Sequence, residues 1–202
     1  MIDQVSLRLN LTAVEHSRLR ELQVAFVDAC NFIAGIVVAH HCWNRVALHH
    51  LVYASVRSQI PKLGSQMVSN AIYTVSRASR KIYQDPESHW KIDPKSPRPL
   101  PQLKFLPNHP VFFDRHTLSV REKMISIFSL DGRLQLKASI PEILKKKLSR
   151  EKLRDIAMQI NDDSCVLHFH FRIPPNDEDY PTQDPSYQLN LPATKILASK
   201  TQ

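Results

Sequence analysis

Hydrophobic residues alternate with polar ones over residues 5–11, which is the pattern of a β-strand with one wet face. Thr12 and Glu15 follow with the spacing of a capping box. An apolar stripe at helical spacing then continues to Val37 and predicts a helix of about seven turns. The pattern breaks after this point, and a second helix is predicted over about residues 43–59.

A third helix is predicted after the helix breakers Pro61 and Gly64. Its buried side is marked by apolar residues at helical spacing, namely Leu63, Met67, Ala71, Ile72, Val75, Ala78 and Ile82. Polar side chains follow one another along the opposite side at steps of three and four: Gln66, Asn70, Tyr73, Arg77, Arg80 and Gln84. We expect this polar stripe to face solvent and to offer groups that pair with base edges and phosphates. The alternative is an ordinary amphipathic helix with a polar outer side.

The second half of the chain changes from helical to strand periodicity. Residues 86–110 hold seven of the 14 prolines, a density that excludes a regular helix or a central strand. Later segments predict strands over 111–113 and 117–120, hairpins over 125–138 and 156–173, and a short helix over 142–148. From residue 174 the sequence is polar and Pro-rich and predicts no element. The first strand has no partner nearby in the sequence, so we expect it to join the later strands in one sheet or barrel.

Charge narrows the class of function. The formal net charge is +8, and residues 29–84 contain basic residues and histidines but no Asp or Glu. A solvated helix normally mixes both signs, so this span indicates an anionic partner. Basic residues are dense again over residues 133–154, which favours contact with phosphates over plain solubility.

The cysteines and the apolar runs bear on location. Three cysteines without a CxxC pair indicate a reducing compartment. The start of the chain lacks the pattern of a signal peptide, and the longest apolar run, about residues 33–39, is far shorter than the ~20 residues of a membrane span. We therefore expect a soluble protein of the cytoplasm with no membrane partner.

The chemistry-bearing residues do not assemble into a catalytic motif. The pairs His40–His41 and His49–His50 are adjacent in sequence, whereas two imidazoles on one helix face need a spacing of four. No pair of carboxylates lies on apolar strands as two-metal hydrolysis requires, because Asp155 is the single acid inside a convincing strand. With Gly occurring three times, a phosphate-binding glycine loop is not expected either. The sequence therefore predicts no catalytic residue, no metal and no cofactor.

Three segments resemble the N-terminal half of TnpB proteins, the transposon-encoded RNA-guided nucleases, also called OrfB transposases, that are ancestral to type V CRISPR effectors. They are LHHLVYASVRSQIPKLGSQMVSNAIYTVSRASRK (48–81), PVFFDRHTLSV (110–120) and ISIFSLDGRLQL (125–136). The resemblance implies an α+β fold, in which an oligonucleotide-binding-like antiparallel β-barrel, the wedge domain, is split by a three-helix recognition insertion. It divides the chain into a first wedge strand (1–11), the insertion (12–84), a Pro-rich crossing (85–110), the rest of the barrel (111–175) and a polar acidic tail (176–202).

The resemblance also implies partners. In this family the recognition insertion contacts target-adjacent DNA and the wedge contacts the guide RNA. Together with the polar stripe, this predicts a DNA-binding set comprising Tyr53, Arg57, Gln66, Asn70, Tyr73, Arg77, Arg80 and Lys81. Together with the basic run, it predicts an RNA-binding set comprising Arg115, Arg133, Lys137, Lys145, Lys146, Lys147 and Arg150.

The sequence departs from the family because the acidic triad of the RuvC nuclease is not found in it. We therefore expect a protein of a prokaryotic cytoplasm that is not itself an enzyme. It would bind guide RNA and double-stranded target DNA, alone or beside a RuvC-bearing chain or full-length relative. Three alternatives stay open: a truncated transposase remnant, a protein that docks on an acidic partner, and a small histidine-based metal hydrolase.

Overall fold

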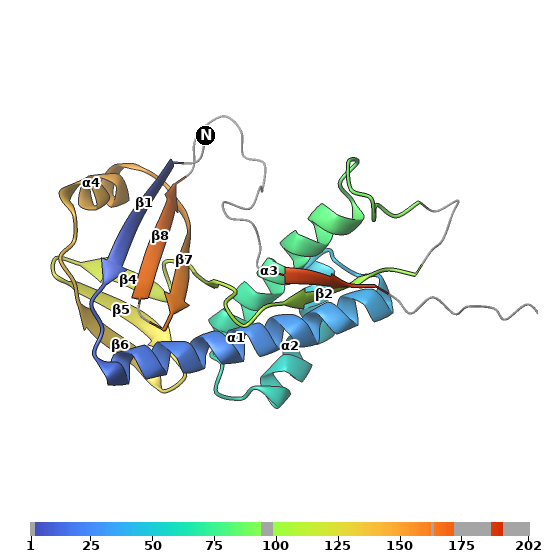
Figure 1. The fold of residues 1–202 in the computed structure, drawn as a ribbon, viewed down its shortest axis with the longest axis horizontal. Coiled ribbons are helices and arrows are strands. Elements are labelled where there is room, and N and C mark those ends of the chain that lie inside the picture. The colour runs from blue at the N-terminus through green and yellow to red at the C-terminus, as the bar shows by residue number, and fades with distance from the viewer. Residues whose placement is uncertain (1–2, 94–98, 163, 172–186, 192–202) are drawn as a thin grey trace, which may run out of the picture.

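A computed structural model describes residues 3–93, 99–162, 164–171 and 187–191 (Figure 1). Its four-stranded sheet has the order β1 (Asp3–Leu9), β8 (Ser164–Phe171), β7 (Leu153–Asn161) and β3 (Val111–Phe113). All neighbours are antiparallel, and Val5 lies opposite Phe169. The prediction that the first strand joins the later strands is therefore confirmed.

A three-stranded antiparallel sheet follows in chain order, made of β4 (Leu118–Arg121), β5 (Met124–Ser129) and β6 (Gly132–Lys137). Gly132 turns the chain between β5 and β6 with a φ of 94°, which an L side chain rarely adopts, so the predicted hairpin turn is confirmed. Helix α4 (Glu142–Arg150) connects this sheet to β7. These two sheets and α4 form a unit that we call the β-lobe.

The second unit, which we call the helical lobe, holds α2 (Arg45–Gln59) and α3 (Ser65–Tyr83) together with a two-stranded sheet. That sheet pairs β2 (Gln102–Phe105) with β9 (Tyr187–Asn190). The Pro-rich crossing thus contains a short strand. The prediction of no element after residue 174 is wrong for β9, which alternates weakly and gains its partner from the crossing.

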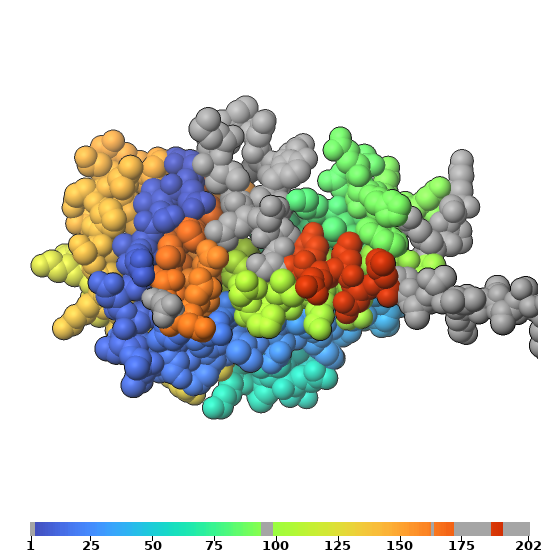
Figure 2. Space-filling model, viewed as in Figure 1, coloured from blue at the N-terminus to red at the C-terminus, as the bar shows by residue number. Residues whose placement is uncertain are grey.

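Helix α1 (Ala13–His40) runs along both lobes, with α2 below it in this view (Figures 1 and 2). It begins with the predicted capping box, in which the Glu15 backbone N–H donates to Thr12 Oγ1 and the Thr12 backbone N–H donates to the Glu15 carboxylate. Its C-cap is His41, which adopts a left-handed conformation with a φ of 49°. Asn44 then caps α2 by accepting from the backbone N–H groups of Val46 and Ala47.

The apolar composition of α1 has a structural explanation. By length and composition this helix could cross a membrane, a test that core helices of soluble proteins also pass. Many of its apolar side chains are buried inside the fold, among them Leu19, Leu22, Phe26, Ile33 and Val37, while Val14 and Val24 are exposed. They pack in a core shared with α2, α3 and the sheets. Since buried apolar area is the main favourable term in folding, this packing accounts for the composition.

Polar residues of α1 fasten the crossing to the helix. Asn31 donates from Nδ2 to the carbonyl oxygen of Phe105 at 3.1 Å and accepts from the Phe105 backbone N–H at 2.7 Å. Gln23, fully buried, donates to the carbonyl oxygen of His109 at 3.0 Å. Side-chain amides of α1 therefore hold the crossing in addition to the β2–β9 ladder.

The α+β class is confirmed, with helices and antiparallel sheets in one chain. Within the described ranges, no sheet closes into a barrel. The four-stranded and three-stranded sheets are connected by the short turn between β3 and β4, and β3 and β4 belong to different sheets.

Candidate nucleic-acid interface

The three-stranded sheet has one buried and one outward face. Its strands alternate strictly, so the buried face carries Leu118, Ile125, Ile127, Leu134 and Leu136, all nearly inaccessible to solvent. The remaining positions, which we call the outward face, are Ser119, Arg121, Met124, Ser126, Phe128, Arg133, Gln135 and Lys137. Three of these positions are basic and none is acidic.

Strand register groups the outward face into rows. Arg121 lies opposite Met124, which lies opposite Lys137, and both basic residues are exposed. The next row is Ser119, Ser126 and Gln135, where Gln135 Nε2 donates to Ser126 Oγ at 3.1 Å. The sheet thus presents cationic groups at one end and neutral hydrogen-bonding groups beside them, a set of groups that can meet both phosphates and base edges.

Arg133 occupies the other end of this face. Its guanidinium lies 5.9 Å from the centre of the Phe128 ring, and it donates to Ser126 Oγ and to the carbonyl oxygen of His116 at 3.1 and 2.6 Å. Arg133 is nevertheless exposed and has no carboxylate partner in the described part of the chain. The side chain is therefore oriented in advance while its charge is not neutralised by an acid.

Helix α4 divides the predicted lysines into two kinds. Lys147 is mostly buried and binds both Asp3 on β1 and Glu151, and its pKa is raised chiefly by the hydrogen bond to Asp3. Lys145 pairs with Glu142 at 2.5 Å. Lys146 and Arg150 are exposed and make no ion pair with a described acid. Of the predicted RNA-binding set, Arg115, Arg133, Lys137, Lys146 and Arg150 are therefore exposed and make no ion pair with a described acid.

The expectation that the polar stripe of α3 faces solvent is wrong for most of its length. Only 8% of Arg77 is exposed, and Asn70 is half-buried and donates to the carbonyl oxygen of Phe112 at 3.1 Å. Gln66 is exposed yet donates to Asp114 Oδ2 at 2.8 Å. The reason is that α3 packs against α1, α2 and β3, and that Arg77 also pairs with Asp155 of β7. A helix between two layers can have a polar side that bonds within the protein.

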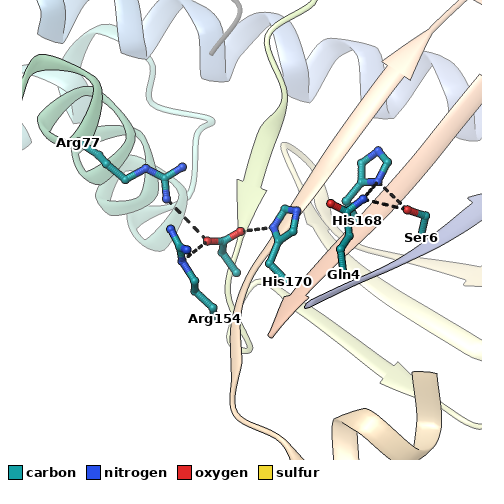
Figure 3. A network of polar contacts seen from close by, with 7 residues as sticks. Gln4, Ser6, Arg77, Arg154, His168 and His170 are labelled. Carbon is teal, nitrogen blue, oxygen red and sulfur yellow. Dashed lines mark hydrogen bonds and ion pairs between the residues drawn. The ribbon is translucent and has the colours of Figure 1, made fainter. Parts of the chain in front are cut away.

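Arg77 reaches a buried network at the junction of the lobes (Figure 3). Its Nη1 lies 3.7 Å from Asp155 Oδ2 on β7, and Arg154 Nε lies 3.3 Å from the same oxygen. The other carboxylate oxygen accepts from His170 Nδ1 at 2.5 Å. Burial alone would raise the pKa of Asp155, but the His170 hydrogen bond and the cationic neighbours hold it below its ordinary value. Asp155 is therefore an ionised carboxylate inside the protein.

The other members of the predicted DNA-binding set are placed on the helical lobe as follows. Arg57 donates to the carbonyl oxygens of Pro61 and Leu63 and so closes the end of α2. Tyr73 is flanked by the guanidinium of Arg45, 4.8 Å from the ring centre. Tyr53 stacks on a histidine of α2. Arg80 is half-buried and Lys81 is exposed. Gln66 and Lys81 are thus the most accessible of the set, and DNA binding by it stays a prediction.

A second polar group lies on the same sheet as Asp155 (Figure 3). His168 on β8 accepts at Nδ1 from Gln4 Nε2 and Ser6 Oγ, at 2.9 and 2.8 Å. The histidines of α1 and α2 do not join it. In the residues that the structure describes, no group of three or more His, Cys, Asp or Glu side chains could hold a metal ion.

Sequence reasoning missed the role of Asp155. The available signal was an acid inside an otherwise apolar strand, opposite a strand that carries His168 and His170 on one side. A buried charge needs partners, so that acid predicted a cation from elsewhere in the chain. Nothing in the local pattern identified Arg77 as this cation, because the pairing is made by tertiary packing.

Comparison with known proteins adds no identification. No protein-family model matches the chain, and a search of curated proteins finds no match.

Proposed function

We propose that this protein binds nucleic acid, with RNA on the outward face of the three-stranded sheet. The observation that carries the proposal is the composition of that face, where Arg121, Arg133 and Lys137 stand among hydroxyl and amide groups without an acid. Helix α4 of the same lobe carries the exposed residues Lys146 and Arg150, which add positive charge to that lobe. Arginine and lysine supply the phosphate contacts that dominate nucleic-acid affinity, and neutral polar groups add contacts to bases and sugars.

The finer proposal is a TnpB-like binding module, in which the β-lobe is an oligonucleotide-binding-like wedge for guide RNA and the helical lobe meets target DNA. Its support is the order of the chain. The first strand pairs with β8, and the helices are inserted between that strand and the rest of the β-lobe. In this proposal the chain binds and does not cut, and any cleavage belongs to a partner chain.

An acidic protein is the competing partner for the same surface. A flat cationic face meets carboxylates by the same Coulomb attraction, so charge alone does not separate the two. RNA is favoured because this face carries both charged and neutral polar groups. Ser119, Ser126 and Gln135 form a continuous neutral row next to the cations. Those groups can donate to and accept from bases and ribose hydroxyls.

The test is to purify the full chain, sequence the RNA that accompanies it, and measure binding of that RNA at several salt concentrations. We expect a discrete transcript, and log K should fall with log salt by roughly 0.7 to 0.9 for each phosphate neutralised. The double variant Arg121→Gln/Lys137→Gln should reduce this slope by about two units. Lys104→Gln, an exposed lysine on β2, serves as the matched control.

Two results would overturn the proposal. One is a salt slope near zero with the copurified RNA. The other is loss of affinity that is equal for the double variant and for Lys104→Gln, since the outward face would then contribute nothing particular. Retention of an acidic protein after ribonuclease treatment, at unchanged yield, would instead support the competing partner.

A further inference from the structure

His109 lies at the junction between the lobes and is 1% exposed. Its ring packs edge-on to Phe105, with centroids 4.8 Å apart, and lies 5.9 Å from the ring of Phe112. Neither ring nitrogen has a hydrogen-bond partner in the part of the chain that the structure describes. Because an imidazolium needs acceptors or water, this site accommodates the neutral ring and disfavours the charged one.

A cation also lies beside Phe112. The guanidinium of Arg77 is 5.3 Å from the centre of the Phe112 ring, so Arg77 and His109 are both neighbours of that ring. Arg77 is also the residue that ties α3 to β7 through Asp155. A proton on His109 would therefore add a second positive charge close to the cation that pairs α3 with β7.

The charged and titratable groups of the elements that form the junction are as follows. Helix α1 contributes Arg20, which donates to the Gln23 amide that binds the His109 carbonyl. Helix α3 contributes Arg77, and β7 contributes Asp155 and Arg154. Strand β8 contributes His168 and His170, and β9 contributes Tyr187, whose ring packs on Phe105. Asp155 is the one carboxylate in this set, and it already has Arg77, Arg154 and His170 as partners.

We propose that the junction is an acid-sensitive latch, in which protonation of His109 repels Arg77 and releases α3 from the four-stranded sheet while each lobe stays folded. This inference does not rest on the proposed function. The latch would change the angle between the lobes by breaking the Arg77–Asp155 pair, which joins α3 to β7 at their boundary (Figure 3).

The pH dependence follows from the difference in the pKa of His109 between the closed and the opened junction. Burial, and to a lesser extent the charge of Arg77, lowers the pKa of His109 to about 4 from its ordinary value of 6.5. The opened junction therefore binds the proton more tightly than the closed one over this interval. The closed junction is therefore most stable above pH 6.5 and loses stability as the pH falls towards 4. His168, whose pKa is lowered by burial and by His170, acts in the same direction. Asp155 would contribute only at lower pH, since its pKa is held below 3.8.

Native-state hydrogen exchange tests the latch, because the protection of an amide reports the opening equilibrium of the segment that contains it. We expect the protection of α3 amides, corrected for the intrinsic exchange rate, to fall by up to about tenfold per pH unit below about 6.5. Amides of the β5–β6 hairpin serve as the internal reference and should keep their protection. In His109→Phe the drop in α3 should be reduced to the smaller part carried by His168, and His109→Leu replaces this variant if it does not fold.

The matched control is His50→Phe, the same substitution at an exposed histidine of α2, which should retain the wild-type response. The latch is refuted if α3 and the hairpin of the wild-type protein lose protection together, because that result describes global unfolding. It is also refuted if His109→Phe keeps the full wild-type response or if wild-type α3 shows no drop between about pH 7 and about pH 5.

Discussion

Asn70 on α3 donates from its side-chain Nδ2 to the backbone carbonyl oxygen of Phe112 on β3, at 3.1 Å. Strand β3 is at the edge of the four-stranded sheet, so a helix side chain takes the place that a further strand would occupy. The helical periodicity predicts that Asn70 contacts bases, but in the structure its side chain binds the edge strand of a sheet. The distinction matters for mutagenesis, because removing such a group affects folding before it affects any ligand.

We expect Asn70→Ala to lower the free energy of unfolding by about 1–2 kcal/mol, since the half-buried Phe112 carbonyl loses its partner. Gln66→Ala, one turn earlier on α3 and exposed, should change it by less than about 0.5 kcal/mol. Urea denaturation of both variants checks this. Equal small effects would show that the Asn70 bond contributes nothing to stability.

Asp155 should be among the most sensitive polar positions of the chain. Asp155→Asn removes the charge that Arg77 and Arg154 share and leaves them buried or nearly so, which should cost about 3 kcal/mol or more. Asp131→Asn is the matched control, because its pair with Lys62 is exposed and should be worth less than about 1 kcal/mol. The two are compared by chemical denaturation. A loss at position 155 no greater than that at 131 would contradict the assigned role of the network.

Gly64 couples the α2–α3 turn to the outward face. A Cβ built at this position would lie 2.5 Å from Phe128 Cε1, so the ring must move if a side chain is introduced. We expect Gly64→Ala to destabilise the protein by about 1–3 kcal/mol. In the background Phe128→Leu the same substitution should cost clearly less, which a double-mutant cycle measures. Additive losses in that cycle would show that Phe128 is not the obstacle.

The thiols should differ in reactivity. Burial raises the pKa of Cys165 to about 12 and that of Cys30 still further, so neither forms an appreciable thiolate near neutral pH. Cys42 is half-buried and should be the first to be alkylated by iodoacetamide. Peptide mass spectrometry after a short reaction of the folded protein measures how much of each cysteine has been alkylated. Alkylation of Cys30 at the rate of Cys42 would show that α1 opens readily.

The sequence was informative wherever local pattern and local chemistry agree. Thr12 and Glu15 predict the start of α1, Asp131–Gly132 predicts the β5–β6 turn, and the search for a partner of residues 5–11 leads correctly to the late strands. Each of these rests on spacing within a few residues or on the need of a lone strand for a neighbour.

The sequence was least informative wherever a residue is defined by a distant partner. Arg77 and Asn70 have helical spacing that fits an outer face equally well, and only packing against β3 and β7 makes them interior groups. Strand β9 is short and becomes a strand through β2. In the sequence Lys147 is one of three consecutive lysines typical of a surface, yet it forms an ion pair with Asp3, which is far from it in the sequence. The pattern of polar and apolar residues identifies the faces of a helix or strand, but it does not identify which other element packs on each face.

The pairing of β1 with β8 also has a consequence for the order of events on the ribosome. Asp3 opposes Phe171, so β1 leaves the ribosome well before its ladder partner β8. At synthesis rates of roughly 5–20 residues per second, β1 waits on the order of ten seconds for that partner. Helices α1 to α3 emerge within this interval and can pack on one another first. The β-lobe is therefore completed late, and during the wait β1 exposes an apolar face that a chaperone would recognise.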